Sequence, residues 1–566
     1  MTDWRDRPAW RLTRHFFDGL FDLGFLSDAG TDRLTRMILG VCAVFLSLGL
    51  VLTRIFAAKY AALGAGGSER YQLAMTADHA FMFGVTMWIA AFVTVLVSHS
   101  LFPDETDFRA LRALPISDRL IFGAKLLALA MFLGQFIVAA QAALMPLAAV
   151  MAFNRWAGPF VPSIAAYAVA NGAASLFAVL AVTALQGALL LGLPRSRLLE
   201  ISAALKSALL AALVLALPGL VRLSARTGAF RDDAWWLYLT PPAWFVGLER
   251  WLLGDGRYAA LAATALAAFT VASSMAVLAY AMLYRRFDLV LSRPAAERAP
   301  AWHRLVFCWR WPRPTSAASV VRAFTALTFR RSVMHQGVLV TLSAIGAGIA
   351  ANSLIAAGTP AWLAAGAPST QGRVASLVWP MFALIFVACR AARTSLRLPI
   401  EQRANWVFRI TERPHARADQ VGAAVQVVRR WGVGLPIAAM LPLLWLAEGP
   451  GALPIAIFAW LWGTIYVEWL MSDWGRLPFT CSYIPGQGFV PQVVVFGFAA
   501  FVGFTTFGTA FSLASMYVPA AFVFAIVALE SAALWLRRQR RQHAADRPLE
   551  FEDQLPTEIN PLRLSD

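Results

Sequence analysis

The chain has 566 residues, of which 59% are hydrophobic and 14% charged. Soluble domains carry roughly 25% charged residues, so this composition excludes an ordinary soluble globular protein. The formal net charge of +17 would suit a nucleic-acid partner, but the basic residues gather in segments between apolar blocks. That distribution indicates membrane topology, and we expect no nucleic-acid partner.

Apolar blocks of about 20 residues, the length that crosses roughly 30 Å of hydrocarbon as a helix, recur along the whole chain. We identify twelve: 37–56, 80–99, 126–150, 163–192, 199–221, 259–283, 337–356, 374–392, 433–447, 453–472, 492–511 and 518–536. They are continuously apolar rather than alternating, which favours helices over membrane strands. The sequence therefore predicts an all-α, polytopic helical membrane protein with about twelve transmembrane helices.

The basic residues predict the orientation. With both termini inside, the inner segments and the inner ends of the spans hold 39 of the 49 Lys and Arg, and the outer loops hold 9. Cytoplasmic loops of membrane proteins carry this excess. We expect both termini to be cytoplasmic and the chain to be integral to a plasma membrane, specifically a bacterial inner membrane.

Three shorter helices are expected outside the spans. Residues 8–28 place charged and aromatic side chains on separate faces, which predicts an amphipathic helix at the membrane interface. A weaker pattern lies around 320–327, where ordinary juxtamembrane sequence is an equal alternative. Residues 239–253, after Pro241 and Pro242, predict a short interfacial or re-entrant helix that either caps a pathway or only anchors the chain.

A short phrase occurs twice and divides the chain. Residues 111–117 read LRALPIS and residues 396–401 read LRLPIE. Each follows an apolar block, so we expect two six-helix halves, each with one cytoplasmic loop of this kind. The predicted organisation is an amphipathic N-terminal segment (1–36), a first half (37–284), a basic connector (285–335), a second half (336–536) and a cytoplasmic tail (537–566).

The residues exclude ATP hydrolysis by this chain itself. A P-loop needs the pattern GxxxxGK[ST], because its lysine reaches the phosphates. The only lysines are Lys59, Lys125 and Lys206, and none stands in that pattern. We find no nucleophile–base arrangement and no metal-ligand spacing, so we expect no enzyme activity, cofactor or metal in this chain.

Few polar residues lie deep in the predicted spans. Lys206, Glu468 and Glu530 lie near inner ends, so we expect the middle of the bilayer to lack charge. The neutral polar residues are Gln135, Gln141, Asn171, Gln186 and Asn352. They either line a pathway or form hydrogen bonds between helices, and we favour the second interpretation.

The loop Phe108–Leu126 reads FRALRALPISDRLIFGAKL, is entered through acidic residues and leads into a long apolar helix. It resembles the permease subunit of a type-2 ABC exporter. The resemblance is best over about 10–285 and looser in the second half, around 398–409. It implies a membrane-spanning permease that a separate ABC ATPase drives, with ATP and Mg bound in that partner. It also implies two copies of the ATPase and contact with membrane lipid. The residues do not identify the substrate.

The same resemblance implies which residues dock the ATPase. In the first half they are Asp104, Arg109, Arg112, Leu114, Pro115, Ile116 and Ser117. In the second half they are Arg397, Leu398, Pro399, Ile400 and Glu401.

Two other classes remain as alternatives. A twelve-helix secondary carrier of the major facilitator type also has two halves and a basic central loop, but the loop 102–120 lacks the glycine of its usual pattern. A polytopic membrane enzyme, such as a lipid-linked glycosyltransferase, needs grouped acidic residues in an outer loop. Asp232 and Asp233 form the only such pair.

Overall fold

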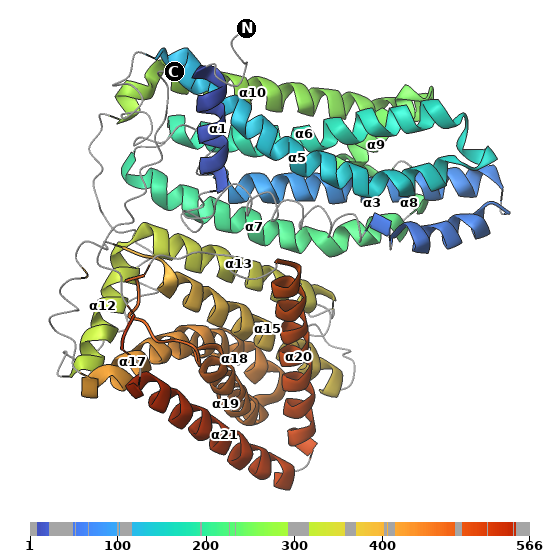
Figure 1. Cartoon of the computed structure of the whole chain (residues 1–566). Coiled ribbons are helices and arrows are strands. Elements are labelled where there is room, and N and C mark those ends of the chain that lie inside the picture. Colours follow the sequence, from blue (N-terminus) through green and yellow to red (C-terminus); the bar gives the residue numbers. More distant parts are fainter. Residues whose placement is uncertain are drawn as a thin grey trace. The chain divides into compact units, whose positions relative to one another are not determined.

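The computed structural model describes most of the chain, and the described residues are helical apart from turns and loops (Figure 1). They are 8–21, 49–50, 52–65, 67–98, 101, 116–192, 195–225, 227–232, 234–291, 316–356, 370–400, 405, 414–481, 490–517, 519–546 and 548–550. Within these ranges a single isolated bridge, between Arg476 and Glu550, is the one extended pairing. The all-α prediction is confirmed for the described residues.

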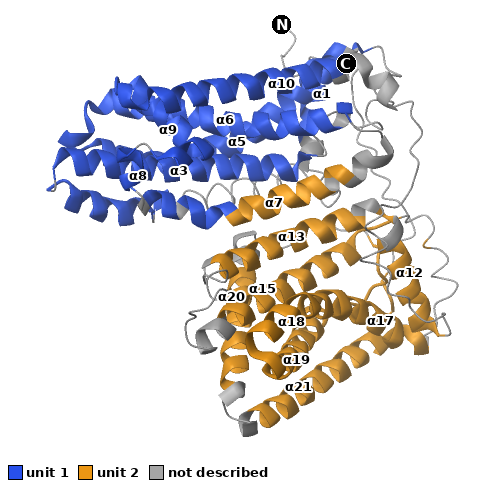
Figure 2. Cartoon of the chain, turned by 180° about the vertical axis from the view of Figure 1, so that it is seen from behind, with its two compact units in different colours: residues 1–198, 216–296, 560–566 blue, residues 199–215, 297–559 orange. Residues whose placement is uncertain are grey.

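The chain divides into two compact units (Figure 2). Unit 1 comprises residues 1–198, 216–296 and 560–566, and unit 2 comprises 199–215 and 297–559. The change from one unit to the other after residue 296 falls in the segment predicted as a connector. Helix α7, Arg195–Ala225, contributes to both units.

The described part of unit 1 is built of helices and short 3₁₀ turns. They are α1 (Pro8–Phe21), α3 (Ser68–Leu96), α5 (Asp118–Ala152), α6 (Phe160–Gly192), α8 (Thr227–Arg231), α9 (Pro241–Leu252) and α10 (Ala259–Leu291), with 3₁₀ turns η3 (Arg155–Ala157), η4 (Trp235–Leu239) and η5 (Gly256–Tyr258). Helix α3 packs against α5, α6 and α9, so it lies at the centre of the unit.

The amphipathic N-terminal segment forms helix α1, which packs against α5. Leu12 and Phe16 are buried. The Lys125 ammonium lies 4.9 Å from the centroid of the Phe16 ring, a cation–π contact. The predicted helix is therefore present, and its apolar face is covered by another helix of the same unit.

The predicted re-entrant segment forms helix α9, which is buried among α3, α6 and α10. It begins with Pro241 and Pro242, where a missing N–H costs nothing. Gly247 lets it approach α10, because a Cβ at that position would collide with Leu261. The proline start and the glycine together place this short helix inside the unit.

Unit 2 is organised around α15 (Thr370–Arg397), which packs against α13 (Val333–Ala356), α18 (Leu435–Glu448), α19 (Ala452–Leu470) and α20 (Val490–Tyr517). The remaining elements are α12 (Ala317–Arg331), η7 (Pro414–Ala416), α17 (Arg417–Arg429), the π turn η8 (Arg430–Gly434), η9 (Gly449–Gly451) and α21 (Pro519–Asp546). The core includes an aromatic cluster in which Phe386 contacts Tyr466 and Phe504 with ring centroids 4.9 Å and 5.8 Å away. Offset and tilted ring pairs of this kind stabilise a core beyond their buried area.

Three predicted segment boundaries, the two ends of the connector and the start of the tail, fall inside helices of the structure. Helix α10 continues to Leu291 and α12 begins at Ala317, so both ends of the predicted connector are helical. Helix α12 starts with a capping box in which Ser316 and Ser319 bond each other's backbone N–H groups. Helix α21 continues to Asp546, so the predicted tail begins as helix.

Nine segments of the described residues are long and apolar enough to cross a bilayer. They are Ser68–Leu96, Arg119–Ala152, Phe160–Leu189, Ala204–Ser224, Gly256–Met282, His335–Ile355, Ser376–Arg397, Arg417–Leu470 and Phe496–Ala514. The segment Arg417–Leu470 contains two of the predicted spans. The predicted span 37–56 lies largely outside the described residues, and the span 518–536 falls in α21, which is helical but is not among the nine.

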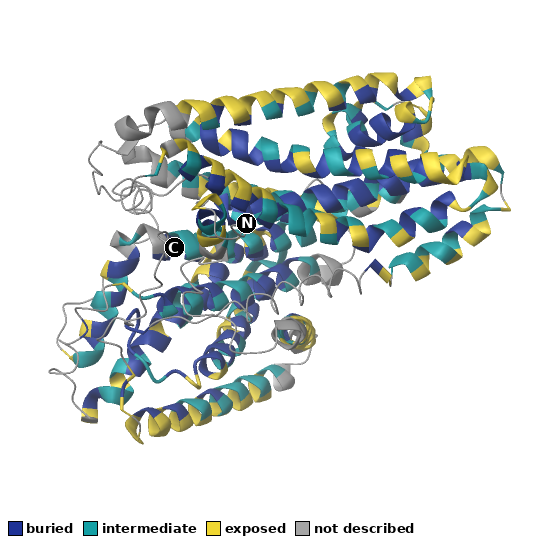
Figure 3. Ribbon diagram, turned by 45° about the horizontal axis from the view of Figure 1, so that its top comes forward, coloured by how far each residue is buried: buried dark blue, intermediate teal, exposed yellow. Residues whose placement is uncertain are grey.

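Buried residues face the inside of each unit, and exposed residues follow the outer helix faces (Figure 3). On α10 the exposed side chains are themselves apolar, among them Leu266, Val271 and Val277 at 48%, 58% and 67% exposure. Large exposed apolar surfaces are rare on soluble monomers and are normal on a lipid-facing helix. The structure thus supports a helical polytopic membrane protein, while the count of twelve spans and the orientation remain predictions.

Candidate functional site

The second predicted docking loop leaves the end of α15. Arg397 is the last residue of the helix, and Leu398, Pro399 and Ile400 follow it. Leu398 is fully buried, whereas Ile400 is 47% exposed. The Leu398 side chain therefore anchors the loop to unit 2, and the Ile400 side chain is accessible from outside.

Residues 471–481, which follow α19, fix this loop through backbone hydrogen bonds. The Phe479 N–H donates to Leu396 O at 2.9 Å, and the Ile400 N–H donates to Phe479 O at 3.1 Å. His335 Nε2 donates to Leu398 O at 3.0 Å. The exposed Ile400 thus belongs to a backbone in which the N–H groups of Leu398 and Ile400 and the carbonyl of Leu398 are hydrogen-bonded.

Phe479 is held in an unusual conformation at the centre of these contacts. Its φ is 68°, the left-handed region that costs a residue with a side chain about 1–2 kcal/mol. Its ring is buried and meets Phe324, Phe329 and His335 at centroid distances of 5.8, 5.7 and 4.8 Å. Ring packing and two backbone hydrogen bonds together offset the cost, so the loop is held in one shape.

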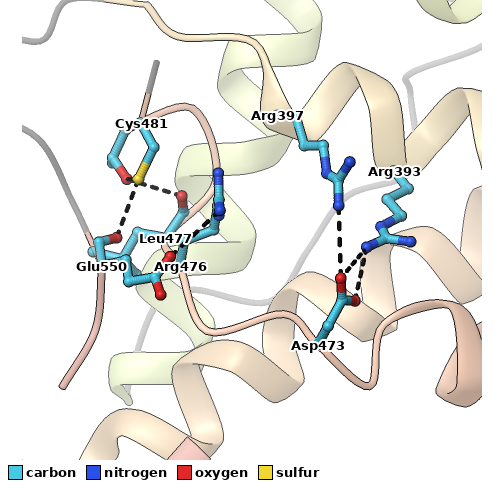
Figure 4. Close-up of polar contacts among 8 residues, drawn as sticks. Arg393, Arg397, Asp473, Arg476, Leu477, Cys481 and Glu550 are labelled. Atoms are coloured by element: carbon cyan, nitrogen blue, oxygen red, sulfur yellow. Dashed lines mark hydrogen bonds and ion pairs between the residues drawn. The ribbon is translucent and has the colours of Figure 1, made fainter. Parts of the chain in front are cut away.

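An arginine–aspartate contact ties the end of α15 to the same segment (Figure 4). Arg393 Nη2 donates to both carboxylate oxygens of Asp473 at 2.7 Å, and Arg397 Nη2 lies 3.8 Å from Asp473 Oδ2. The side chain of Arg393 is 14% exposed and that of Asp473 is 65% exposed. One carboxylate therefore orients two of the arginines near the predicted docking residues.

Residues 548–550, near the C-terminus, join the same loops (Figure 4). The Glu550 N–H donates to Gly475 O at 3.1 Å, and Cys481 Sγ donates to Glu550 O at 3.4 Å. Arg476 Nη2 lies 3.3 Å from Glu550 Oε2. We name residues 393–400, 471–481 and 548–550 together the loop cluster.

Only the last two residues of the first predicted docking loop are described. Asp104, Arg109, Arg112, Leu114 and Pro115 lie outside the described residues, as does Glu401 of the second loop. Ser117 caps helix α5, where its C=O accepts from the N–H groups of Leu120 and Ile121 at 2.9 Å and 3.3 Å. Ile116 beside it is half-buried.

Two of the five predicted polar residues meet in unit 1. Asn171 is fully buried, and its Nδ2 donates to Tyr167 Oη at 3.2 Å and to Gln141 Oε1 at 3.5 Å. Thr86 donates to Asn171 Oδ1. This network joins α3, α5 and α6, which agrees with bonding between helices.

The other three predicted polar residues lie apart from that network. Asn352 lies in unit 2, where its Nδ2 donates to Val214 O at 2.5 Å. Gln186 is buried on α6, and Gln135 is half-buried on α5 with its Oε1 buried and unpartnered.

The structure also contains a buried charged group that the sequence did not predict. Lys59 Nζ donates to both oxygens of Asp78 at 2.9 Å and 2.7 Å, Tyr60 Oη donates to Asp78 Oδ2 at 2.6 Å, and Ser224 donates to Asp78 Oδ1. On the next residue, His79 Nδ1 lies 2.8 Å and 2.9 Å from the two Glu249 oxygens. We name these six residues the polar centre.

The carboxylates and the imidazole of the polar centre are buried in unit 1, whereas the Lys59 side chain is 37% exposed. Asp78 and Glu249 are fully buried and His79 is 1% exposed. Asp78 and His79 are the eleventh and twelfth of the 29 residues of α3, a helix that is among the nine apolar segments. The sequence analysis did not count them among the residues of a span, because the predicted span 80–99 begins directly after His79. The adjacent pair Asp78-His79 was the signal available, but Glu249 belongs to a segment read as an outer loop.

Glu468 in unit 2 is also paired rather than directed to the solvent. Its two oxygens accept from Arg537 Nε at 3.1 Å and Arg540 Nε at 2.9 Å. Glu468 is 2% and Arg540 6% exposed, so this contact joins α19 to α21 inside the unit.

Within the described ranges no three His, Cys, Asp or Glu side chains are grouped to hold a metal ion. Comparison with protein-family models, with curated proteins and with solved structures finds no match to this chain.

Proposed function

We propose that this protein is the membrane-spanning permease subunit of an ATP-driven exporter of the ABC type, which couples a separate ATPase through cytoplasmic loops. The observation that carries the proposal is the loop cluster. The Leu-Pro-Ile phrase that occurs twice in the sequence lies, at its second occurrence, on a loop held by backbone bonds, an arginine clamp and a packed phenylalanine.

A coupling surface has to transmit force between two proteins. A loop that is already ordered loses little conformational entropy on binding, and a rigid contact passes a displacement on to the helices behind it. Here Ile400 offers an exposed apolar contact, and Arg397 offers a charge that is 29% exposed beside it. The loop leaves α15, the helix around which unit 2 packs, so a push on Ile400 would reach the core of that unit.

ATP and Mg would bind in the partner, because this sequence lacks a P-loop. Two ATPase copies per chain would match two docking loops. The protein would lie in a bacterial inner membrane and move an unidentified substrate outward through its helical units.

The test is purification of the tagged full-length chain in mild detergent from its native cells, with identification of co-purifying proteins. We expect a Walker-motif ATPase with the wild type. We expect Ile400→Asp to reduce its recovery at least tenfold, since a charge in an apolar contact remains unsatisfied.

Val320→Asp is the matched control, since Val320 is 55% exposed in unit 2 and lies outside the nine apolar segments. It should retain the ATPase. Equal recovery with Ile400→Asp and the wild type, while both remain monodisperse, would refute docking at this loop.

The polar centre favours a second candidate, an ion-coupled secondary carrier. Ionisable residues inside membrane spans are costly and are commonly functional. Asp78 and His79 belong to α3, one of the nine apolar segments, and His79 contacts the buried Glu249 of α9. A carrier needs no ATPase. A stable wild-type preparation from native cells without a co-purifying ATPase would therefore favour an ion-coupled carrier over an ABC permease.

A further inference from the structure

Arg250, in the last turn of α9, is a buried cation with two unpaired donors. The residue is 7% exposed, and its Nε and Nη2 atoms are buried without a hydrogen-bond partner. A guanidinium presents five donors in a planar fork and stays charged at any pH a protein experiences. A buried charge of this kind is costly unless an anion pairs with it.

The nearby carboxylates are already engaged. Asp78 is bound by Lys59, Tyr60 and Ser224, and both oxygens of Glu249 lie against His79. Asp255 receives hydrogen bonds from Arg257 Nε and Nη2 at 3.1 Å and 2.9 Å. Each of these three carboxylates thus has its own partner at hydrogen-bond distance.

Arg250 acts on its surroundings only at longer range. The pKa of Asp255 is lowered chiefly by its side-chain hydrogen bond with Arg257, with a smaller electrostatic contribution from Arg250. Arg250 also interacts electrostatically with Tyr60 and Tyr258. Its surroundings therefore contain two tyrosine hydroxyls and an engaged aspartate.

We propose that Arg250 anchors an oxyanion-binding site at the α9–η5 end of unit 1, which takes a phosphate or carboxylate group. Two parallel N–H donors match two oxygens of such a group in a bidentate pair. This inference is independent of the proposed function, since it depends on a side chain outside the loop cluster.

The surface beside the site suits an amphiphilic ligand. Trp251 and Leu252, which follow Arg250, are each 47% exposed. Tryptophan and apolar side chains of this kind gather at the depth of lipid headgroups. The oxyanion has two chemical sources, a phospholipid headgroup or a small soluble anion.

The purified full-length chain is titrated with four probes while thermal unfolding and tryptophan fluorescence are followed. The probes are mixed micelles containing phosphatidylglycerol, mixed micelles containing phosphatidylcholine, sodium phosphate and sodium acetate. Phosphatidylglycerol and phosphatidylcholine share the phosphodiester and differ in net charge, so they separate an anionic from a zwitterionic headgroup.

The variants are Arg250→Gln, which removes the charge, and Arg250→Lys, which keeps the charge but not the fork. Arg231→Gln is the matched control, because Arg231 belongs to unit 1, is 67% exposed and pairs with Glu69 at 3.6 Å.

We expect an anionic probe to raise the unfolding temperature of the wild type. We expect Arg250→Gln to weaken that binding by at least about tenfold, Arg250→Lys to weaken it less, and Arg231→Gln to leave it unchanged. An effect of phosphatidylglycerol alone assigns the site to a lipid headgroup, and an effect of phosphate or acetate assigns it to a soluble anion.

The wild-type titration keeps the inference testable if Arg250→Gln does not fold. A wild type that responds to none of the anionic probes overturns the site. Equal affinity in the wild type, in Arg250→Lys and in any folded Arg250→Gln protein also overturns it.

Discussion

At the scale of single residues, contacts between polar side chains in this protein differ in depth. His79–Glu249 is buried, whereas Arg231–Glu69 has both side chains more than 65% exposed. Exposed ion pairs contribute about 0–1 kcal/mol because water screens them. Removing one partner of a buried hydrogen-bonded pair leaves the other partner unsatisfied and costs about 1–3 kcal/mol. Loss of one partner should therefore lower the stability of the protein much more for the buried pair than for the exposed pair.

We therefore predict that Glu249→Ala markedly lowers the yield of monodisperse protein and its unfolding temperature. Glu69→Ala removes a carboxylate from the same unit and should change neither. Fluorescence-detected size exclusion and a thermal ramp measure both quantities. Similar behaviour of the two variants would mean that His79 and Glu249 do not form the buried pair.

We predict that loss of the Asp473 carboxylate lowers the stability of the protein less than loss of the Glu249 carboxylate does. Removal of Asp473 leaves Arg393, a side chain only 14% exposed, without the two 2.7 Å bonds that it donates. An orphaned, mostly buried donor costs about 1–3 kcal/mol, so Asp473→Ala should lower the unfolding temperature by a few degrees.

Asp419→Ala is the matched control, since Asp419 lies 3.5 Å from Arg541 with both side chains more than 60% exposed. It should be neutral. A neutral Asp473→Ala in the same thermal ramp would show that the clamp on Arg393 does not stabilise the loop cluster.

The sequence analysis identified some of these residues and missed others. It selected Arg397, Leu398 and Ile400 because a repeated phrase marked them. It could not find Asp473 or Glu249, because their partners lie 80 and 170 residues away in the chain. Apolar periodicity indicates which segments are helical, but which polar side chains meet depends on how the helices pack.

At the scale of elements, short helices define this fold as much as the long ones. The sequence predicted helices at 8–28 and 239–253, and the structure has α1 at Pro8–Phe21 and α9 at Pro241–Leu252. The first was expected at the membrane interface and the second as an interfacial or re-entrant helix. In the structure α1 packs on α5, and α9 is buried among three helices. Amphipathic and proline signals locate such helices but do not distinguish a lipid surface from a protein surface.

Packing of α9 gives a further prediction. A methyl group at Gly247 would collide with Leu261 of α10, whereas a Cβ at Gly123 of α5 would meet nothing within 4 Å. Gly247→Ala should therefore destabilise the protein by about 1–3 kcal/mol through overpacking. Gly123→Ala should be neutral or stabilising, since alanine favours helix.

Unfolding temperatures of these two glycine variants, measured in the same detergent, check this contrast. A Gly247→Ala protein as stable as the wild type would show that α9 does not approach α10 closely.

At the scale of the whole molecule, composition and apolar block length identified the class. The described residues are helical, and nine segments are long and apolar enough to cross a membrane. The division into two units after residue 296 falls within the predicted connector. At the second occurrence of the Leu-Pro-Ile phrase the structure has a loop ordered by backbone hydrogen bonds.

The central claim is that the loop carrying Leu398, Pro399 and Ile400 contacts a separate ATPase. Photo-cross-linking tests it most directly. A benzophenone amino acid at position 400, where the native side chain is 47% exposed, is activated in native cells, and the adduct is identified by mass spectrometry. The same amino acid at position 235, where Trp235 is 74% exposed in a predicted outer segment, is the control.

We predict an adduct with a Walker-motif ATPase from position 400 and none from position 235. Efficient insertion of both proteins without any ATPase adduct from position 400 would contradict the account.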